Sequence, residues 1–449
     1  MLDTVLRARH VVTPDGERPA AVGLCDGRIA VVAPYDEPLV ATSEQVLRDD
    51  LVLLPGLVDT HVHLQDPGRD WEGFDSGTRA AALGGVTTVV DMPLDSLPVT
   101  LDADAVRAKV AAARGRVHVD VALWGGVTPD NLDRVDELAA TGVRGFKCFL
   151  ADTGTTEFAP LEPHQLPEVL RRVATTGLVL LVHAEDAETL AAHGATGPVR
   201  SYDSFLRHHP RSAETQAVAA VIAAVAETGA RAHVVHVSTG AAVALIGLAR
   251  AEGLPLSAET CPHYLVLDAP STAVGGTLAK VCPPVQNGES DGLWEGLRTG
   301  ALDLVVSDHS PCALTDKRLG SGDLTAAVGG IASLQLGLPL VWTAARERGF
   351  TLVDVALWMA QRPAELAGLD TKGAIEVGRD ADLVVLDPGA TFVVEPGRLA
   401  HRLTRTPYDG RSLTGVVSQT WLAGSPVDLS HPRGRVLLHG HHDRMEPRP

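Results

Sequence analysis

Two histidines separated by one residue close the first long apolar run after the amino-terminal fifty residues. His61 and His63 end the segment LVDTHVH, and because side chains alternate faces along a strand, both imidazoles point the same way. Two imidazoles on one face can hold one divalent metal ion. The pair alone is weak evidence for a metal site. Its position at the carboxyl end of a predicted strand strengthens that prediction, because barrel enzymes carry their functional groups there.

Polar side chains recur at the same place in four later runs. Each residue closes a run rich in β-branched residues, and they are Lys147 in VRGFKCF, His183 in LVLLVHAED, His236 in AHVVHVS and Asp308 in LDLVVSDHS. Six such residues at the matching ends of five strands favour one shared metal site over six separate buried polar groups.

A lysine among metal ligands needs a chemical explanation, because an ammonium group has three donors and no lone pair. If Phe146 packs under the helices, the alternation along the strand points Lys147 into the barrel. Nearby cations would lower the pKa of the amine, which could then take up carbon dioxide and become an anionic carbamate that bridges two ions. The alternative is an unmodified lysine that pairs with a substrate anion.

Four neutral imidazoles, one carbamate and one carboxylate suit a pair of Zn²⁺ ions, or similar ions such as Mn²⁺, Co²⁺ or Fe²⁺. Two ions about 3.5–4 Å apart would hold a bridging hydroxide at neutral pH. Asp308 would be both a ligand and the general base, taking the proton and handing it to the departing nitrogen. The residues therefore predict hydrolysis without a protein nucleophile.

Eight short apolar runs alternate with segments of helical periodicity and would position these residues. This alternation predicts an α/β fold with a (β/α)8 barrel. The helix 212–228 is well marked, with Gly229 just beyond its end. The eight runs are residues 57–63, 86–91, 117–124, 143–149, 178–183, 232–236, 256–259 and 302–308.

Both ends of the chain have β character instead. Short strands fill the first fifty residues, with Asp26-Gly27 as a hairpin signal, and the β pattern returns after about Lys372. Neither end is large enough to fold alone, so we expect the two to join in one small β-sandwich. The predicted division is residues 1–50 for its first part, 51–372 for the metal-dependent hydrolase barrel, and 373–449 for its second part and a polar tail.

The composition excludes several classes of partner. The chain has 449 residues, with 38 Lys+Arg against 56 Asp+Glu and a formal net charge of −18. Phosphate backbones and anionic lipid repel such an excess of acid, which argues against binding to nucleic acid or membranes. The start lacks the layout of a signal peptide and the five cysteines lack CxxC spacing, so we expect a cytoplasmic protein with reduced thiols.

These motifs resemble the amidohydrolase superfamily and, within it, the cyclic amidohydrolases: dihydropyrimidinase, hydantoinase, dihydroorotase and allantoinase. The resemblance runs from PGLVDTHVHL through GFKCFLADTG, VHAED, VHVSTG, ETCPHYL and SDHSPC to GAIEVGRDADLVVLDP. It implies a barrel with a β-sandwich, commonly assembled as a homotetramer. It also implies a first metal ion on His61, His63 and Asp308, and a second on His183 and His236, with N6-carboxylated Lys147 as the bridging ligand.

Among these branches the chain looks most like allantoinase, in segments such as DPGRDWEGFDSGTRAAALGGVTTVVDMPLDSLP and VVSDHSPC. Gln65 and Leu94 replace the residues that bind the substrate carboxylate in dihydroorotases, and Asp152 replaces the tyrosine of dihydropyrimidinases. The resemblance implies hydrolysis of allantoin to allantoate in purine breakdown. Allantoinases usually carry other residues at four positions, which here are Gln65, Asp95, His209 and Gln286.

Two alternatives to that function stay open. One is a hydantoinase-like or dihydropyrimidinase-like enzyme, which would open a related cyclic amide or ureide with the same metal ions. The other is a non-catalytic scaffold, although such proteins usually lose ligands and none is lost here. The candidate substrate contacts are Gln65, Asp95, Asp152, His263 and Gln286, and for His263 a structural role is equally open.

Overall fold

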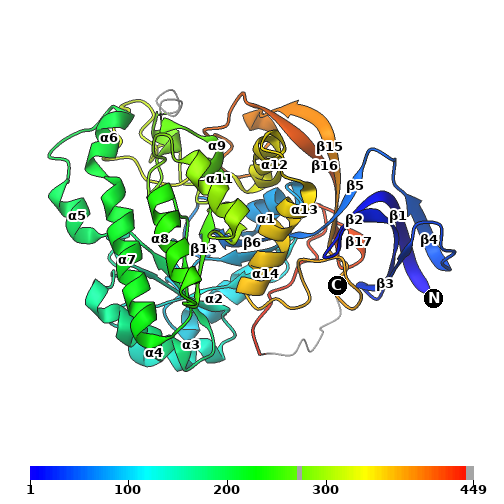
Figure 1. The fold of residues 1–449 in the computed structure, drawn as a ribbon, viewed down its shortest axis with the longest axis horizontal. Coiled ribbons are helices and arrows are strands. Elements are labelled where there is room, and N and C mark those ends of the chain that lie inside the picture. Colours follow the sequence, from blue (N-terminus) through cyan, green and yellow to red (C-terminus); the bar gives the residue numbers. More distant parts are fainter. Residues whose placement is uncertain (270–275, 441–449) are drawn as a thin grey trace.

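The computed structural model describes residues 1–269 and 276–440, in which a barrel surrounded by helices lies beside a separate sheet (Figure 1). The barrel strands are parallel and hydrogen-bond in two groups. The first group is β6 (Leu57–Val62), β7 (Val86–Asp91) and β8 (Asp120–Leu123). The second is β9 (Gly125–Gly126), β10 (Gly145–Phe149), β11 (Val179–His183), β12 (Ala232–Val234), β13 (Leu256–Thr260) and β14 (Leu304–Val305).

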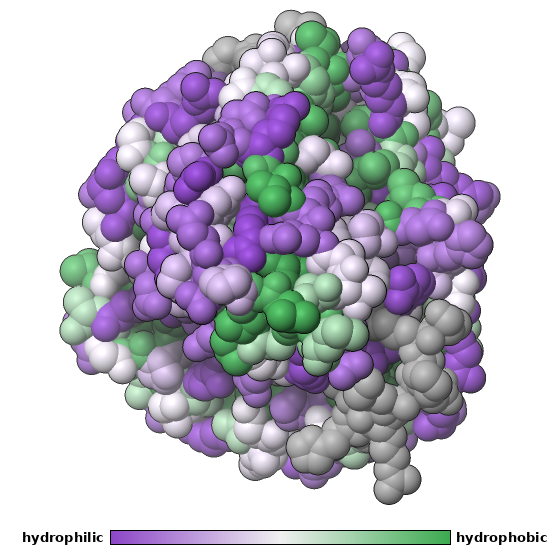
Figure 2. All heavy atoms as spheres, turned by 90° about the vertical axis from the view of Figure 1, so that its right-hand side faces the viewer, coloured by the Kyte–Doolittle hydropathy of each residue, from purple (hydrophilic) through white to green (hydrophobic). Residues whose placement is uncertain are grey.

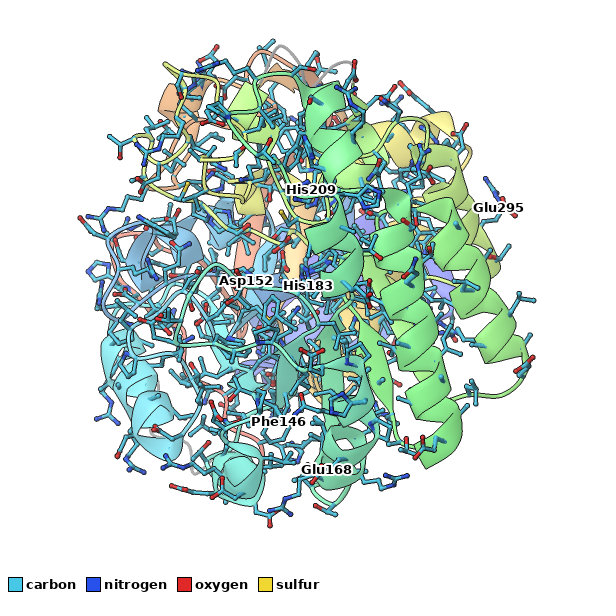
Figure 3. All side chains as sticks on the ribbon, turned by 90° about the vertical axis from the view of Figure 1, so that its left-hand side faces the viewer. Phe146, Asp152, Glu168, His183, His209 and Glu295 are labelled. Atoms are coloured by element: carbon cyan, nitrogen blue, oxygen red, sulfur yellow. The ribbon has the colours of Figure 1, made fainter. Side chains whose placement is uncertain are left out.

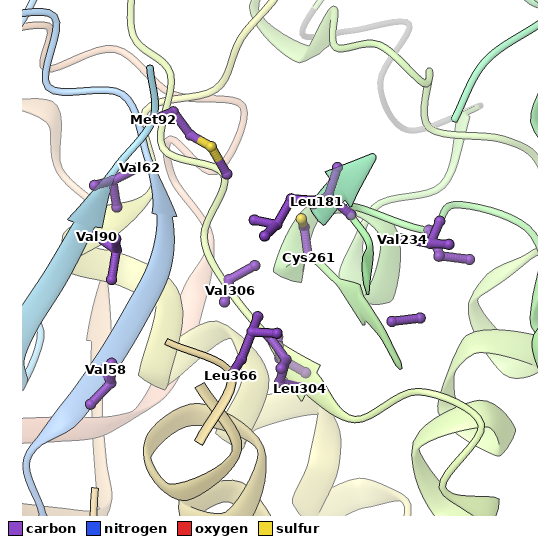
Figure 4. Close-up of a cluster of buried hydrophobic side chains, with 14 of the residues drawn as sticks. Val58, Val62, Val90, Met92, Leu181, Val234, Cys261, Leu304, Val306 and Leu366 are labelled. Atoms are coloured by element: carbon purple, nitrogen blue, oxygen red, sulfur yellow. The ribbon is translucent and has the colours of Figure 1, made fainter. Parts of the chain in front are cut away.

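The two groups of strands close into one barrel. Only Trp124 separates β8 from β9, and a parallel bridge between Val62 and His309 joins β6 to the segment after β14. β8 and β9 together correspond to one predicted run, so the eightfold alternation is confirmed. Apolar side chains from several of these strands, Val58, Val90 and Leu181 among them, belong to one continuous core (Figure 4).

Two strands end two or more residues earlier than predicted. β12 stops at Val234 and β14 at Val305, so His236 and Asp308 lie just beyond the strands rather than on their last residues. Both residues have positive φ, 41° and 44°, a left-handed backbone conformation that does not continue a β-strand. The expectation that these two residues terminate strands is therefore wrong by two to three positions.

Helices cover the outside of the barrel (Figure 1). The predicted helix 212–228 is α7 (Arg211–Thr228), and Gly229 ends it in the left-handed conformation. The other long helices are α1 (Phe74–Leu83), α2 (Ala103–Ala113), α4 (Leu166–Ala174), α8 (Gly240–Ala251), α11 (Ser290–Thr299) and α12 (Gly337–Glu347). Shorter ones are α3 (Val135–Ala140), α5 (Ala187–Ala192), α6 (Tyr202–His208), α9 (Pro262–Val266), α13 (Leu352–Ala356) and α14 (Arg362–Leu366).

Strands from both ends of the chain join, as expected, and their hydrogen bonds make one continuous sheet where a β-sandwich was predicted. The strand order is β17-β16-β15-β5-β1-β2-β3 with β4 beside β1. The predicted Asp26-Gly27 turn joins β2 to β3, with φ of 50° and 74°. The amino-terminal strands are β1 (Leu2–Thr13), β2 (Gly16–Cys25), β3 (Arg28–Pro34), β4 (Ala41–Val46) and β5 (Val52–Pro55). The carboxyl-terminal strands are β15 (Leu383–Val393), β16 (Ser412–Leu422) and β17 (Ser425–Pro426).

The terminal sheet has its own apolar cluster, in which Leu6, Val22 and Leu53 pack with Leu383 and Trp421. The face of the molecule on this side is mostly hydrophilic (Figure 2). Some of its apolar residues are scattered, and others gather in a small patch. The division at residues 50/51 and 372/373 stays a prediction. Part of the expected polar tail, residues 441–449, lies outside the described residues.

Residues 434–437 pair with the amino end of β8, since Val121 N donates to the carbonyl of Arg435 and Leu437 N to that of Val121. The five cysteines form no disulfide with one another. None of the described helices combines the length and apolar character needed to cross a membrane.

Candidate metal centre

His61, His63 and Asp308 meet at the carboxyl end of β6. The Nε2 atoms of His61 and His63 lie 3.3 and 3.5 Å from the same Oδ1 atom of Asp308, and one potential ligand atom of each residue lies within 4.8 Å of the others. All three side chains are buried. Two nitrogens and a carboxylate oxygen at this spacing suit Zn²⁺ or a similar ion.

Lys147, His183 and His236 lie beside the first three residues. Nδ1 of His183 is 2.8 Å from Nε2 of His236, and the rings of His61 and His236 have centroids 5.4 Å apart. Nζ of Lys147 is buried and has no hydrogen-bond partner among the described residues. Because buried donors are normally satisfied, this amine without a partner fits a side chain that is chemically modified before it binds metal ions.

All six candidate ligands line one cavity of about 700 Å³. It opens at the carboxyl end of the barrel strands, and its lining also includes Asp152 and His209, which are labelled with His183 in Figure 3. The structure therefore brings together the residues that the sequence placed at matching strand ends.

Three of the four histidines contact a carboxylate through their other ring nitrogen. The pairs are His61 with Glu259 (2.5 Å), His63 with Asp95 (3.0 Å) and His183 with Glu185 (2.9 Å). A carboxylate on the second nitrogen fixes the tautomer and the orientation of a metal-binding imidazole. Sequence reasoning missed Glu185 and Glu259, although Glu185 follows His183 by two residues and Glu259 closes a predicted strand.

Burial and neighbouring charges set the protonation states. Burial lowers the pKa of Lys147 to about 8, which increases the neutral fraction of the amine. Burial alone would raise the pKa of Asp308, but His61 and His63 hold it well below its usual value, so the carboxylate is ionised. For His63, burial lowers the pKa, but Asp308 and Asp95 outweigh it and raise the pKa to about 9. A metal ion binding here must therefore displace a proton from His63.

Backbone strain is concentrated at this site. Seven non-glycine residues of the described chain have positive φ, and four of them belong to the site: Gln65, Asp95, His236 and Asp308. Such conformations cost energy and persist where the surroundings impose them. Asp59 is one such constraint, because its carboxylate accepts hydrogen bonds from the backbone N–H groups of His61 and Ser307, at 3.1 Å each.

Only three of the five predicted substrate contacts line the cavity. Gln65, Asp95 and Asp152 line the cavity, whereas His263 and Gln286 are not among its lining residues. Gln286 donates to the carbonyl oxygen of His209 at 3.1 Å. His263 is buried, and neither ring nitrogen has a hydrogen-bond partner among the described residues; burial lowers its pKa to about 4. The substrate roles of all five stay predictions.

Further polar side chains line the cavity without having been predicted. Arg69 and Trp71 come from the segment after β6, and the guanidinium carbon of Arg69 lies 4.7 Å from the ring of Trp71. Lys280 and Asp316 line the same cavity. They stand in irregular segments between the strands and helices, where neither periodicity nor a strand end distinguishes them from ordinary surface residues.

Comparisons with known proteins show which proteins this chain resembles. Residues 52–427 match the model of the amidohydrolase family. The chain is 47% identical to an allantoinase of Streptomyces avermitilis, over 97% of this chain and 98% of the relative. It is 39% identical to an allantoinase of Arabidopsis thaliana, over 94% and 87%. A solved L-hydantoinase (dihydropyrimidinase) of Arthrobacter aurescens superposes with a TM-score of 0.90 at 30% identity, covering 98% of each chain.

Proposed function

This chain belongs to the amidohydrolase family, and from that premise we propose that it hydrolyses the cyclic amide bond of allantoin to give allantoate. The observation that carries the proposal is the similarity to allantoinases over nearly the full length of both chains. His61, His63, Lys147, His183, His236 and Asp308 around one cavity support the hydrolytic part of it.

The donor atoms divide into two sets. His61, His63 and Asp308 would hold one ion, and His183 and His236 a second, with Lys147 bridging as its carbamate. The neutral amine of Lys147 forms an N–C bond to carbon dioxide and releases one proton, which leaves a two-oxygen anion in place of an orphaned donor. When bound, two divalent ions, which we expect to be Zn²⁺ or else Mn²⁺, Co²⁺ or Fe²⁺, polarise a carbonyl and lower the pKa of water.

Asp308 moves the proton. A water molecule adds to the scissile carbonyl carbon of the ring, and the ionised Asp308 carboxylate accepts the proton that this water gives up. The carboxylate then donates that proton to the ring nitrogen as the C–N bond breaks. The neighbouring histidines lower the pKa of Asp308, so its carboxylate is ionised at neutral pH and has a free lone pair for the proton.

Asp95, Glu185 and Glu259 orient the histidines, and Gln65 and Asp152 contact the substrate. Gln65 already donates to the carbonyl oxygen of Pro311, at 2.6 Å, and so ties the two segments that lead into the cavity. Because allantoin is uncharged, the cavity needs no excess of one charge, and its lining includes Arg69 as well as these carboxylates and amides.

A substrate panel on metal-quantified protein tests the proposal. Allantoin, hydantoin, dihydrouracil and dihydroorotate are offered to the full chain loaded with Zn²⁺, and allantoin should give the highest kcat/KM. The variant Asp308→Asn serves as the matched control, because it keeps the shape of the side chain and loses the proton acceptor. Brisk opening of hydantoin or dihydrouracil without turnover of allantoin would reject the allantoin assignment.

The second candidate is a hydantoinase or dihydropyrimidinase activity, favoured by the similarity to the solved L-hydantoinase. The same panel decides between the two. A scaffold without activity would show less than one equivalent of metal per chain after growth with excess metal. We further propose that the enzyme acts in the cytoplasm as a homotetramer, that it needs no nucleic acid or membrane, and that its domains divide at residues 50/51 and 372/373.

A further inference from the structure

One wall of the cavity is a stretch of main chain, residues 327–330. It runs beside the segment that follows Asp308, because His309 forms a parallel bridge with Ile331 and Ser310 N donates to the carbonyl of Ile331 at 3.1 Å. At Gly330, φ is 123° and an added Cβ would lie 1.9 Å from the carbonyl oxygen of Ser310. The wall is therefore packed directly against the segment after β14 that carries the proposed proton acceptor, Asp308.

Two lysines hold this wall through its carbonyl oxygens. The Nζ atom of Lys317 donates to the carbonyls of Val328, at 3.1 Å, and Gly330. The Nζ atom of Lys280 donates to the carbonyl of Ala327. The main chain of Lys280 also accepts from Gly330 N at 2.8 Å. Three of the four wall carbonyls are thus bound by ammonium groups.

Neither ammonium group is neutralised by a partner. In residues 1–269 and 276–440, the ion pairs made by lysines involve Lys109 and Lys372, and no carboxylate pairs with Lys280 or Lys317. Lys317 is only 1% exposed, and burial lowers its pKa to about 8. Burying a charge without a counter-charge lowers stability, so packing alone gives no reason for a lysine at this position.

The use of lysine across the chain supports a special role. The chain has only five lysines, at positions 109, 147, 280, 317 and 372. Four are buried and Lys280 is half-buried, so arginine supplies the surface cations of the described chain. Lysine, a compact point charge on a flexible stem, therefore occurs in this chain only at buried or half-buried positions.

We propose that Lys317, together with Lys280, is a positioning residue that fixes the wall 327–330 against the cyclic substrate beside Asp308. Misplacing a reacting group by about 1 Å can cost on the order of a hundredfold in rate, and a free stretch of glycine-containing main chain would allow such movement. The inference rests on the proposed function for the identity of the substrate, but not for the rigidity of the wall.

The test compares four variants of the full-length, Zn²⁺-loaded protein by hydrogen–deuterium exchange and steady-state kinetics. Lys317→Met removes the ammonium and keeps the length, Lys317→Arg restores donors, and Lys280→Met removes the neighbouring donor. The control is Arg200→Met. Arg200 lies on the exposed surface, and its Nε atom donates to the carbonyl oxygen of Ser321 in the adjacent loop at 3.2 Å.

In Lys317→Met we expect faster exchange of the amides of Val328 and Gly330, and a fall in kcat/KM for allantoin on the order of 10- to 100-fold. Metal content should stay unchanged, with partial recovery in Lys317→Arg and no effect of Arg200→Met. Lys280→Met should also speed exchange in the wall, which keeps the test decisive if Lys317→Met does not fold.

Unchanged exchange in the wall of both methionine variants would overturn the inference. So would faster exchange spread evenly over the molecule with a lower melting temperature, because that result indicates a purely structural role. If the wild-type protein does not open allantoin, the proposed function fails on its own. The exchange comparison still decides whether the lysines hold the wall.

Discussion

Lys147 and Lys372 are both buried, but they lie at opposite ends of the barrel in opposite electrostatic surroundings. Nζ of Lys372 lies 2.6 Å from Asp120, 2.9 Å from Asp380 and 2.6 Å from Asp382. Burial alone would lower the pKa of Lys372, but the three carboxylates raise it above its usual value. Nζ of Lys147 has no hydrogen-bond partner among the described residues, and burial lowers its pKa to about 8.

This difference indicates that the lysine at one end of the barrel stabilises the fold, whereas the lysine at the other end takes part in chemistry. Asp120 begins β8, whereas Asp382 immediately precedes β15 of the terminal sheet, so Lys372 ties the two units together through a satisfied cluster. Lys147 lies inside β10, two residues before the strand ends, rather than closing it as predicted. Its side chain lines the cavity on the side where barrel enzymes place their active sites. An unsatisfied amine costs stability at that end, and it remains free for chemistry.

The largest effect that would sharpen this comparison is expected for Lys147→Ala. Loss of the bridging anion should remove several kcal/mol of transition-state stabilisation, on the order of a thousandfold or more in turnover. The melting temperature of the metal-free protein should hold or rise, because no ion pair is broken. Turnover, bound metal and melting temperature are measured together. Partial recovery with added short carboxylic acids would support the bridging role, and wild-type turnover would contradict it.

Lys372→Met should show the opposite profile. Three buried carboxylates would lose their cation, which costs about 3–5 kcal/mol when one partner of a buried ion pair is removed. The denaturation midpoint should fall steeply, while turnover per bound metal in the folded fraction stays near that of the wild type. A wild-type midpoint, or a selective loss of turnover, would break the distinction between the two ends.

Glu259→Gln tests how the chemical end is supported. The amide keeps the shape but loses the charge that orients His61, and such changes typically weaken metal binding 10- to 100-fold. Competition with a chelator measures the affinity. Glu227→Gln is the matched control, because Glu227 pairs with Arg171 on the exposed surface. Equal metal affinity in the two variants would argue against the orienting role.

The smallest expected effect is the pH dependence of metal uptake. In the metal-free protein His63 has a pKa of about 9, so below that pH it holds a proton that a metal ion must displace. Affinity should therefore rise with pH, by up to about tenfold per unit for one proton, and level off near pH 9. In Asp95→Asn, His63 loses a carboxylate, so the plateau should begin at lower pH. Calorimetric titrations at several pH values measure both, and a pH-independent affinity would refute the assignment.

Periodicity and strand ends predicted most of the fold. β7 has its predicted bounds and α7 differs from its prediction by one residue, because alternating apolar runs and helical stripes are local signals. The meeting of the six candidate ligands was also predictable, since parallel strands in a barrel bring their carboxyl ends to one face. The early ends of β12 and β14 were not, because the positive φ at His236 and Asp308 leaves no mark in the residue types.

The sequence by itself determined the architecture and the type of site: a barrel, a terminal sheet, and a set of nitrogen and oxygen ligands near the ends of the barrel strands. Only the tertiary structure decided which buried charges are paired. His61 meets Glu259 across 198 positions and Lys372 meets Asp120 across 252, while Lys147 and Lys317 form no ion pair with a carboxylate of the described residues. These outcomes depend on distances between elements that are far apart in the chain. The presence of a lysine in the sequence does not show whether a carboxylate will lie beside it in the folded protein.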